Sequence, residues 1–120
     1  MRTREAIIFV RRGDDVLAVH RSPDQGGYWH SVAGGVEEGE TYIEAAAREL
    51  REETGLVADV APLGRAFDYD GIRVEAFVAD APDGWEPTLD WEHDEYRWCS
   101  PVEAAELMYW PEPRDIVGSL

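Results

Sequence analysis

Apolar residues fall in short runs along the chain, and turns rich in glycine, proline and acidic residues separate these runs. The run 5–10 is apolar apart from its first residue, Glu5, which predicts a buried strand. The segment 16–21 alternates in polarity, so it predicts a second strand that forms a hairpin with the first. By the same criteria we expect extended segments at 28–33, 57–63, 65–69, 72–79 and 95–99, and loops at 22–27, 70–71 and 81–89.

One stretch in the middle of the chain has helical signals at both ends. Thr41 followed by Glu44 is a capping-box pattern, in which each side chain bonds the backbone N–H near the other. From Tyr42 the chain is rich in alanine, leucine, arginine and glutamate, which favour helix. Gly55 is the expected stop, because the residue after a helix often adopts a left-handed conformation. We therefore predict a helix from Tyr42 up to Gly55.

The predicted helix has two chemically different faces. Its apolar stripe is expected to be the set Ile43, Ala46, Ala47 and Leu50, which would pack on a sheet. The carboxylates of Glu49, Glu52 and Glu53 lie three and four residues apart and are expected to converge on another face. Such oxygens suit hard cations such as Mg²⁺. The alternative is a solvated acidic face with arginine partners on the same helix.

A second helix is predicted near the end of the chain. Ser100 is its expected N-cap, Pro101 its first residue and Glu103 its third, and the helix should reach Met108. Prolines at 111 and 113 are expected to interrupt the chain before a short final segment. Strands around two helices predict an α/β sandwich with a mixed sheet, formed by a single domain over residues 1–120.

Composition narrows the classes of function. The net charge is −15, from 26 acidic and 11 basic residues, and such a field repels duplex nucleic acid. The apolar run near the N-terminus is too short for a signal peptide or a membrane span, so we expect a cytoplasmic protein without a membrane partner. Cys99 is the only cysteine, and we expect it to be a partly buried residue of a strand.

Residues 34–56 match a known motif at every specified position. The motif is the Nudix box, G-x5-E-x7-R-E-U-x-E-E-x-G-U, where U is aliphatic. Its counterparts here are Gly34, Glu40, Arg48, Glu49, Leu50, Glu52, Glu53, Gly55 and Leu56. The chain therefore resembles the Nudix hydrolases, which implies the Nudix fold: an α/β/α sandwich with a mixed β-sheet and the Nudix loop-helix. The resemblance also implies metal-dependent hydrolysis of a diphosphate linkage.

The resemblance also implies roles for residues of the motif. The metal ligands would be Glu49, Glu52, Glu53 and Gly34, and the metal would be Mg²⁺, with Mn²⁺ as the alternative. Structural roles would fall to Gly35, Glu40, Arg48 and Gly55. Beyond the motif, Glu92 precedes the predicted last strand and is a candidate metal ligand or base, against a plain loop carboxylate. We therefore predict Glu53, Glu52 and Glu92 as the catalytic residues.

Two further passages bear on the substrate. Residues 28–41 are similar to the corresponding stretch of bacterial dihydroneopterin triphosphate pyrophosphatases. The pair Glu92-His93, with Tyr96 and Trp98 after it, resembles a pattern shared with diadenosine tetraphosphate hydrolases. Trp110 and Arg114 resemble the tail of the pterin enzymes, although the segment 63–91 is shorter than its counterpart in those enzymes.

We accordingly expect a small phosphorylated substrate. The predicted substrate-binding residues are Arg21, which would bind phosphate, together with Tyr28, Trp29, Trp110 and Arg114. A surface ion pair is the alternative for Arg21, and we expect one of Tyr28 and Trp29 to belong to the core. The expected reaction is pyrophosphohydrolysis of a nucleoside triphosphate or dihydroneopterin triphosphate. The rival hypotheses are a dinucleoside polyphosphate hydrolase, an enzyme that removes damaged nucleotides, and a Nudix-fold binding module without activity. The sequence leaves a homodimer open.

Overall fold

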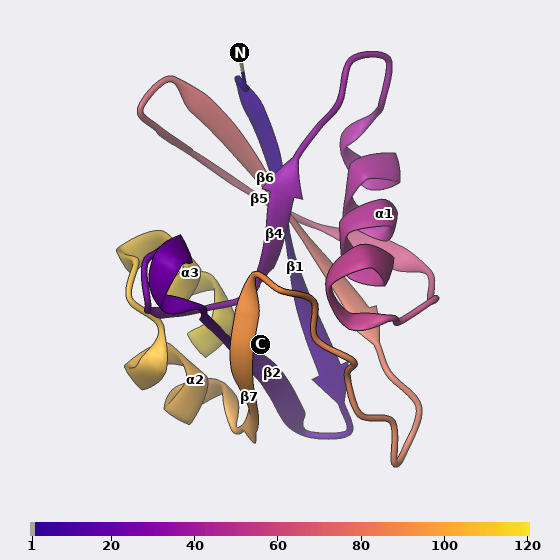
Figure 1. Cartoon of the computed structure of the whole chain (residues 1–120), viewed down its shortest axis with the longest axis vertical. Helices are drawn as coiled ribbons and strands as arrows, with labels where there is room; N and C mark the ends of the chain where they lie inside the picture. Colours follow the sequence, from indigo (N-terminus) through magenta and orange to yellow (C-terminus); the bar gives the residue numbers. More distant parts are fainter. Residues whose placement is uncertain (1) are drawn as a thin grey trace.

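The computed structural model describes residues 2–120 and shows a mixed sheet with helices on both faces (Figure 1). The strands are β1 (Arg4–Arg12), β2 (Asp15–Arg21), β3 (Trp29–His30), β4 (Val32–Gly35), β5 (Val60–Tyr69), β6 (Ile72–Asp80) and β7 (His93–Cys99). The helices are α1 (Tyr42–Thr54), α2 (Pro101–Leu107) and α3 (Pro111–Gly118), with a 3₁₀ turn at Pro23–Gln25. The α/β/α sandwich and most of the predicted strands are confirmed. The extended segment predicted at 28–33 instead belongs to two strands, β3 and β4, and the segments predicted at 57–63 and 65–69 form the single strand β5.

β1 is the central strand, and its neighbour on one side changes along its length. On the other side it pairs with the parallel strand β6 throughout. On the changing side its first half, Glu5–Ile8, pairs with β4, whereas Arg11 and Arg12 pair with β2 in the predicted hairpin. β2 in turn pairs with β3 and β7. The sheet therefore divides into two branches, and the chain crosses from one to the other between β3 and β4.

The β5–β6 hairpin confirms the turn predicted at Asp70-Gly71. Both residues have positive φ angles, 48° and 76°. This pattern is typical of the type I′ turn, whose twist matches that of the strands it joins. The hairpin places Tyr69, the last residue of β5, beside the beginning of β1.

Side chains of β1 alternate between two apolar cores because both faces of the sheet are covered. Ala6 and Ile8 pack on the face of α1, together with Leu50. Ile7 and Phe9 pack on the opposite face, which α2 and α3 cover. A strand buried on both faces reads as a continuous apolar run, which explains the pattern at 5–10. Cys99 is buried in the second core, as expected for a strand residue, and burial raises the pKa of its thiol.

The ends of α1 are as predicted, but its apolar stripe was partly wrong. Thr41 and Glu44 form both bonds of the capping box, and Gly55 adopts a φ of 82°. Ile43, however, is 43% exposed, and Ala45 is buried in addition to Ala46 and Leu50. The helix turns the face that bears Glu49 and Glu53 toward the sheet, so the flank that bears Ile43 stays in solvent.

The C-terminal segment forms a helix that the sequence reading missed. α2 has the predicted cap at Ser100, but the prediction that prolines interrupt the chain at 111 and 113 was wrong. Both prolines lie in the first turn of α3, where proline is tolerated because those N–H groups have no partner within the helix. α3 packs on the sheet through Ile116 and Val117. None of the helices in residues 2–120 has the length and apolar character needed to cross a membrane.

The orientation of α1 predicts that shortening its two large aliphatic side chains, Leu50 and Ile43, lowers the stability of the protein by different amounts. Leu50→Ala removes a fully buried side chain and should lower the free energy of unfolding by about 2–5 kcal/mol. Ile43→Ala, on the exposed flank, should lower it by less than about 1 kcal/mol. Chemical denaturation of both variants measures the difference, and equal losses would contradict the observed orientation.

Candidate active site

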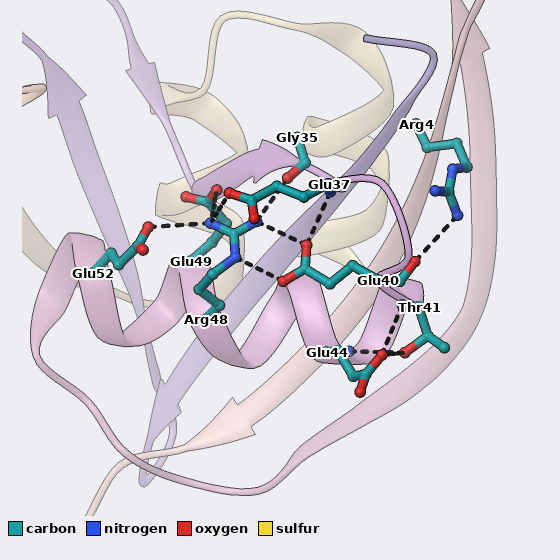
Figure 2. Close-up of polar contacts among 9 residues, drawn as sticks. All are labelled: Arg4, Gly35, Glu37, Glu40, Thr41, Glu44, Arg48, Glu49 and Glu52. Carbon is teal, nitrogen blue, oxygen red and sulfur yellow. Dashed lines mark hydrogen bonds and ion pairs between the residues drawn. The ribbon is translucent and has the colours of Figure 1, made fainter.

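Arg48 joins the loop after β4 to helix α1 (Figure 2). Its Nε donates to Glu40 Oε2 at 2.7 Å, and its Nη2 donates to Glu40 Oε1 at 2.9 Å, so the pair is bidentate. The same Nη2 donates to the carbonyl oxygen of Gly35 at 2.9 Å. The Glu37 N–H in turn donates to Glu40 at 2.9 Å. These bonds fix the loop on the first turns of the helix.

Electrostatics reinforces this connection. The hydrogen bonds from Arg48 and from the Glu37 backbone lower the pKa of Glu40 to about 2, so the carboxylate is charged at any ordinary pH. Hydrogen bonding to Glu40 and Glu49 likewise raises the pKa of Arg48, against the opposing effect of its burial. Charged pairs with two parallel bonds are the strongest and most directional of the ordinary hydrogen bonds.

The motif carboxylates occupy three different environments. Glu49 is largely buried and accepts from Arg48 Nη1 at 2.8 Å. Glu52 lies on the solvent side of the helix and accepts from the same nitrogen at 3.1 Å. Glu53 is fully buried, and neither of its oxygens has a hydrogen-bond partner among the residues that the structure describes. Burial, followed by the neighbouring Glu49, raises the pKa of Glu53 to about 11.

Gly34 provides the space that Glu49 occupies. A Cβ atom at position 34 would lie 2.1 Å from the carboxyl carbon of Glu49. Any side chain there would displace this carboxylate, so glycine at position 34 leaves the space in which the end of the Glu49 side chain lies. The carboxylate thereby reaches a cavity that Gly34 also lines.

His93 lies next to Glu53, and Asp90 lies next to His93; the sequence did not predict this arrangement. His93 is buried, with its Nε2 3.7 Å from Glu53 Oε1 and its Nδ1 3.1 Å from Asp90 Oδ1. Burial lowers the pKa of His93. In the sequence, only the Glu92-His93 pair pointed to this location.

A cavity of about 600 Å³ lies beside the motif. Glu49, Gly34, Glu92 and Arg21 line one part of it. Arg21 donates to the backbone oxygen of Gln25 at 3.0 Å, and its Nη2 lies 3.7 Å from Glu92. Burial and the charge of Asp90 raise the pKa of Glu92. The structure thus brings Arg21 and Glu92 together with Glu49.

The predicted substrate-binding residues divide into two groups. Tyr28 and Trp110 line the cavity, and their rings lie 5.9 Å apart in an edge-to-face arrangement. Trp29 and Arg114 are absent from its lining within residues 2–120. Trp29 instead packs beneath Arg97, whose guanidinium lies 4.9 Å from the ring centre, and Arg114 is exposed on α3.

The carboxylate oxygens of Glu49, Glu52 and Glu53 are ligands that suit a hard divalent cation, although the structure does not arrange them as a complete metal site. In residues 2–120 no three His, Cys, Asp or Glu side chains are already arranged as a metal site. Arg48 holds Glu49 and Glu52, and a cation would compete with its guanidinium for their oxygens. The two unpartnered oxygens of buried Glu53 are nevertheless the kind of group that a cation stabilises.

Comparison with known proteins identifies the class. The family model described as the NUDIX domain matches residues 1–119, and the chain therefore belongs to the Nudix family of hydrolases. This confirms the resemblance carried by residues 34–56.

Individual relatives add detail. The CTP pyrophosphohydrolase of Escherichia coli K12 is 35% identical over 114 residues, which cover 92% of this chain and 83% of that protein. An octanoyltransferase of Myxococcus xanthus is 33% identical over 127 residues, but the chain spans only 36% of its length. The structure of the E. coli dihydroneopterin triphosphate pyrophosphohydrolase superposes with a TM-score of 0.84 at 24% identity, covering 98% of this chain and 93% of that one. This last likeness shows the fold.

The lowered pKa of Glu40 predicts a pH-dependent contribution to stability. Because its pKa falls from 4.5 to about 2 on folding, the pairing with Arg48 stabilises fully above the unfolded value and is lost as pH falls toward 2. The stability difference between the wild-type chain and Glu40→Gln should therefore be largest near about pH 6 and shrink toward about pH 2. Urea titrations across this range measure it, and a constant difference would contradict the assignment.

Proposed function

We propose that the chain is a divalent-metal-dependent pyrophosphohydrolase that converts a nucleoside triphosphate, or a related triphosphate, to the monophosphate and pyrophosphate. The observation that carries the proposal is the buried carboxylate of Glu53, which has no hydrogen-bond partner within residues 2–120 and lies next to Glu49. Glu49 itself lines a cavity large enough for a nucleotide. The similarity to a CTP pyrophosphohydrolase over most of both chains supports it.

In this proposal Glu49, Glu52, Glu53 and the backbone of Gly34 hold the cation, Mg²⁺ or Mn²⁺. When bound, such an ion lowers the pKa of water and neutralises charge that develops on the phosphoryl oxygens. Arg48 positions Glu49 and Glu52, and it would give up part of its hydrogen bonding to them when a cation is bound. Its bonds to Glu40 and Gly35 keep the loop in place while it does so.

The chain's own groups then bind the substrate and move a proton. Glu92 is the base that we favour, because it lines the cavity and its raised pKa makes it a better proton acceptor than an ordinary carboxylate. Arg21 contacts the phosphates from the same part of the cavity. The rings of Tyr28 and Trp110 contact the nucleobase of the substrate.

Glu53→Gln should separate catalysis from folding. In the metal-free protein Glu53 is neutral because of its raised pKa, so an equally neutral amide of the same shape should leave thermal stability nearly unchanged. With Mg²⁺, turnover of nucleoside triphosphates should fall by roughly 10²–10³-fold. Mn²⁺ binding, followed by electron paramagnetic resonance, should weaken in parallel. Glu38→Gln, on the exposed loop, is the matched control and should behave like the wild-type chain. Near-normal turnover by Glu53→Gln would remove Glu53 from the mechanism.

Gly34→Ala tests the space reserved for Glu49. The new methyl group would collide with the carboxylate, so kcat should fall by about 10²-fold while the fold is retained. Gly118→Ala is the control, because a Cβ atom there meets Ala105 at an ordinary 3.5 Å. Steady-state kinetics and circular dichroism measure both effects; unchanged kcat in Gly34→Ala would show that the position of Glu49 is unimportant.

A further inference from the structure

Glu5 places a buried carboxylate in the wall of the cavity, outside the Nudix motif. It stands in β1 opposite Gly35 and is 9% exposed. Its Oε1 accepts from the hydroxyl of Tyr69 at 2.9 Å, and its Oε2 accepts from Arg2 at 3.1 Å. The side chain is therefore held by donors from two other parts of the chain.

The carboxylate keeps acceptor capacity for a ligand. An ionised carboxylate has about four lone-pair sites, and the bonds from Tyr69 and Arg2 use one on each oxygen. Arg2 balances its charge. Burial and the bond to Glu5 raise the pKa of Tyr69 to about 12, so the phenol remains a donor. Glu5 thus presents fixed, unused acceptor sites to the cavity.

The surroundings of Glu5 suit a flat ring that carries N–H groups. Phe67, Tyr69 and Trp110 contribute aromatic surface to the cavity. Asp70, which follows Tyr69 in sequence, also lines the cavity and adds a negative charge to that of Glu5, against the single positive charge of Arg2. Phosphates would be repelled here, whereas the amino group of a heterocycle would be attracted.

We infer that Glu5 is a specificity-determining residue: it accepts a hydrogen bond from an exocyclic amino group on the base of the substrate. The inference rests on the proposed function, since it names the kind of base that the triphosphate carries. An oxo group in the same position would be an acceptor that faces the acceptor oxygens of Glu5, with no proton between them. Burying the oxo group without a hydrogen-bond donor is strongly disfavoured. The cavity therefore favours amino-bearing bases over their oxo counterparts.

Pairs of nucleotides that differ at this group provide the test. CTP and UTP differ at position 4 of the base, and GTP and ITP differ by the 2-amino group. In the wild-type chain kcat/KM should favour CTP over UTP, or GTP over ITP, by about tenfold or more. Glu5→Gln should reduce that preference to within about threefold, chiefly by slowing the amino-bearing nucleotide.

Two further variants separate recognition from general effects. Glu5→Asp keeps the charge but withdraws the carboxylate by one methylene, so it should also lose the preference. This variant decides the question if Glu5→Gln does not fold. Glu38→Gln removes an exposed charge outside this cavity and should keep the wild-type preference. An undiminished preference in the folded Glu5 variants, or no preference in the wild-type chain, would overturn the inference.

A binding measurement distinguishes failure of this inference from failure of the proposed function. Titration of CMP and UMP, or GMP and IMP, can be followed by tryptophan fluorescence, since Trp110 lines the cavity. Tighter binding of the amino-bearing member, lost in Glu5→Asp, would support the role of Glu5 even without turnover. Turnover of triphosphates without discrimination in either assay would leave the enzyme assignment intact and overturn the role of Glu5.

Discussion

The ion pair between Arg48 and Glu40 is the interaction on which the site depends. A single guanidinium bonds both oxygens of Glu40, the carbonyl of Gly35 and the carboxylates of Glu49 and Glu52. It thereby fixes the glycine-containing end of β4 relative to the acidic face of α1. The same charge offsets the repulsion between carboxylates that stand within one helical turn of each other.

The division of the sheet gives this acidic face access to a cavity. Glu49 belongs to the helix on one face of the sheet, whereas Ile7 and Trp110 approach the cavity from the face covered by α2 and α3. Gly34 lacks a side chain at the point where the two sides meet, so the Glu49 carboxylate lines the same space as they do. A reaction at the carboxylates and recognition of a base can therefore take place in one cavity.

Features with local signals could be predicted from the sequence, and features that need tertiary contacts could not. The caps at Thr41, Gly55 and Ser100 are defined by neighbouring residues, and all three were predicted. The exposure of Ile43 depends on how α1 lies on the sheet. α3 was missed because prolines are helix breakers only beyond the first turn.

The same distinction between local signals and tertiary contacts applies to the residues of the site. The motif residues were found through their fixed spacing, and their roles as ligands stay a prediction. Two contacts of the site join residues that are far apart in the sequence: Glu5 with Tyr69, and His93 with Glu53. No local sequence pattern predicts such contacts. Tyr28 and Trp29 are adjacent in sequence, and one of them was expected in the core. Only Tyr28 lines the cavity, and the sequence did not indicate which of the two would do so.

The most direct test of the account is the identity of the products. Phosphorus-31 NMR of the wild-type chain with Mg²⁺ and a nucleoside triphosphate resolves orthophosphate, pyrophosphate and the nucleotide released. We expect nucleoside monophosphate and pyrophosphate in equal amounts, and no reaction after the metal is chelated. Release of orthophosphate and nucleoside diphosphate, or turnover that persists without metal, would contradict it.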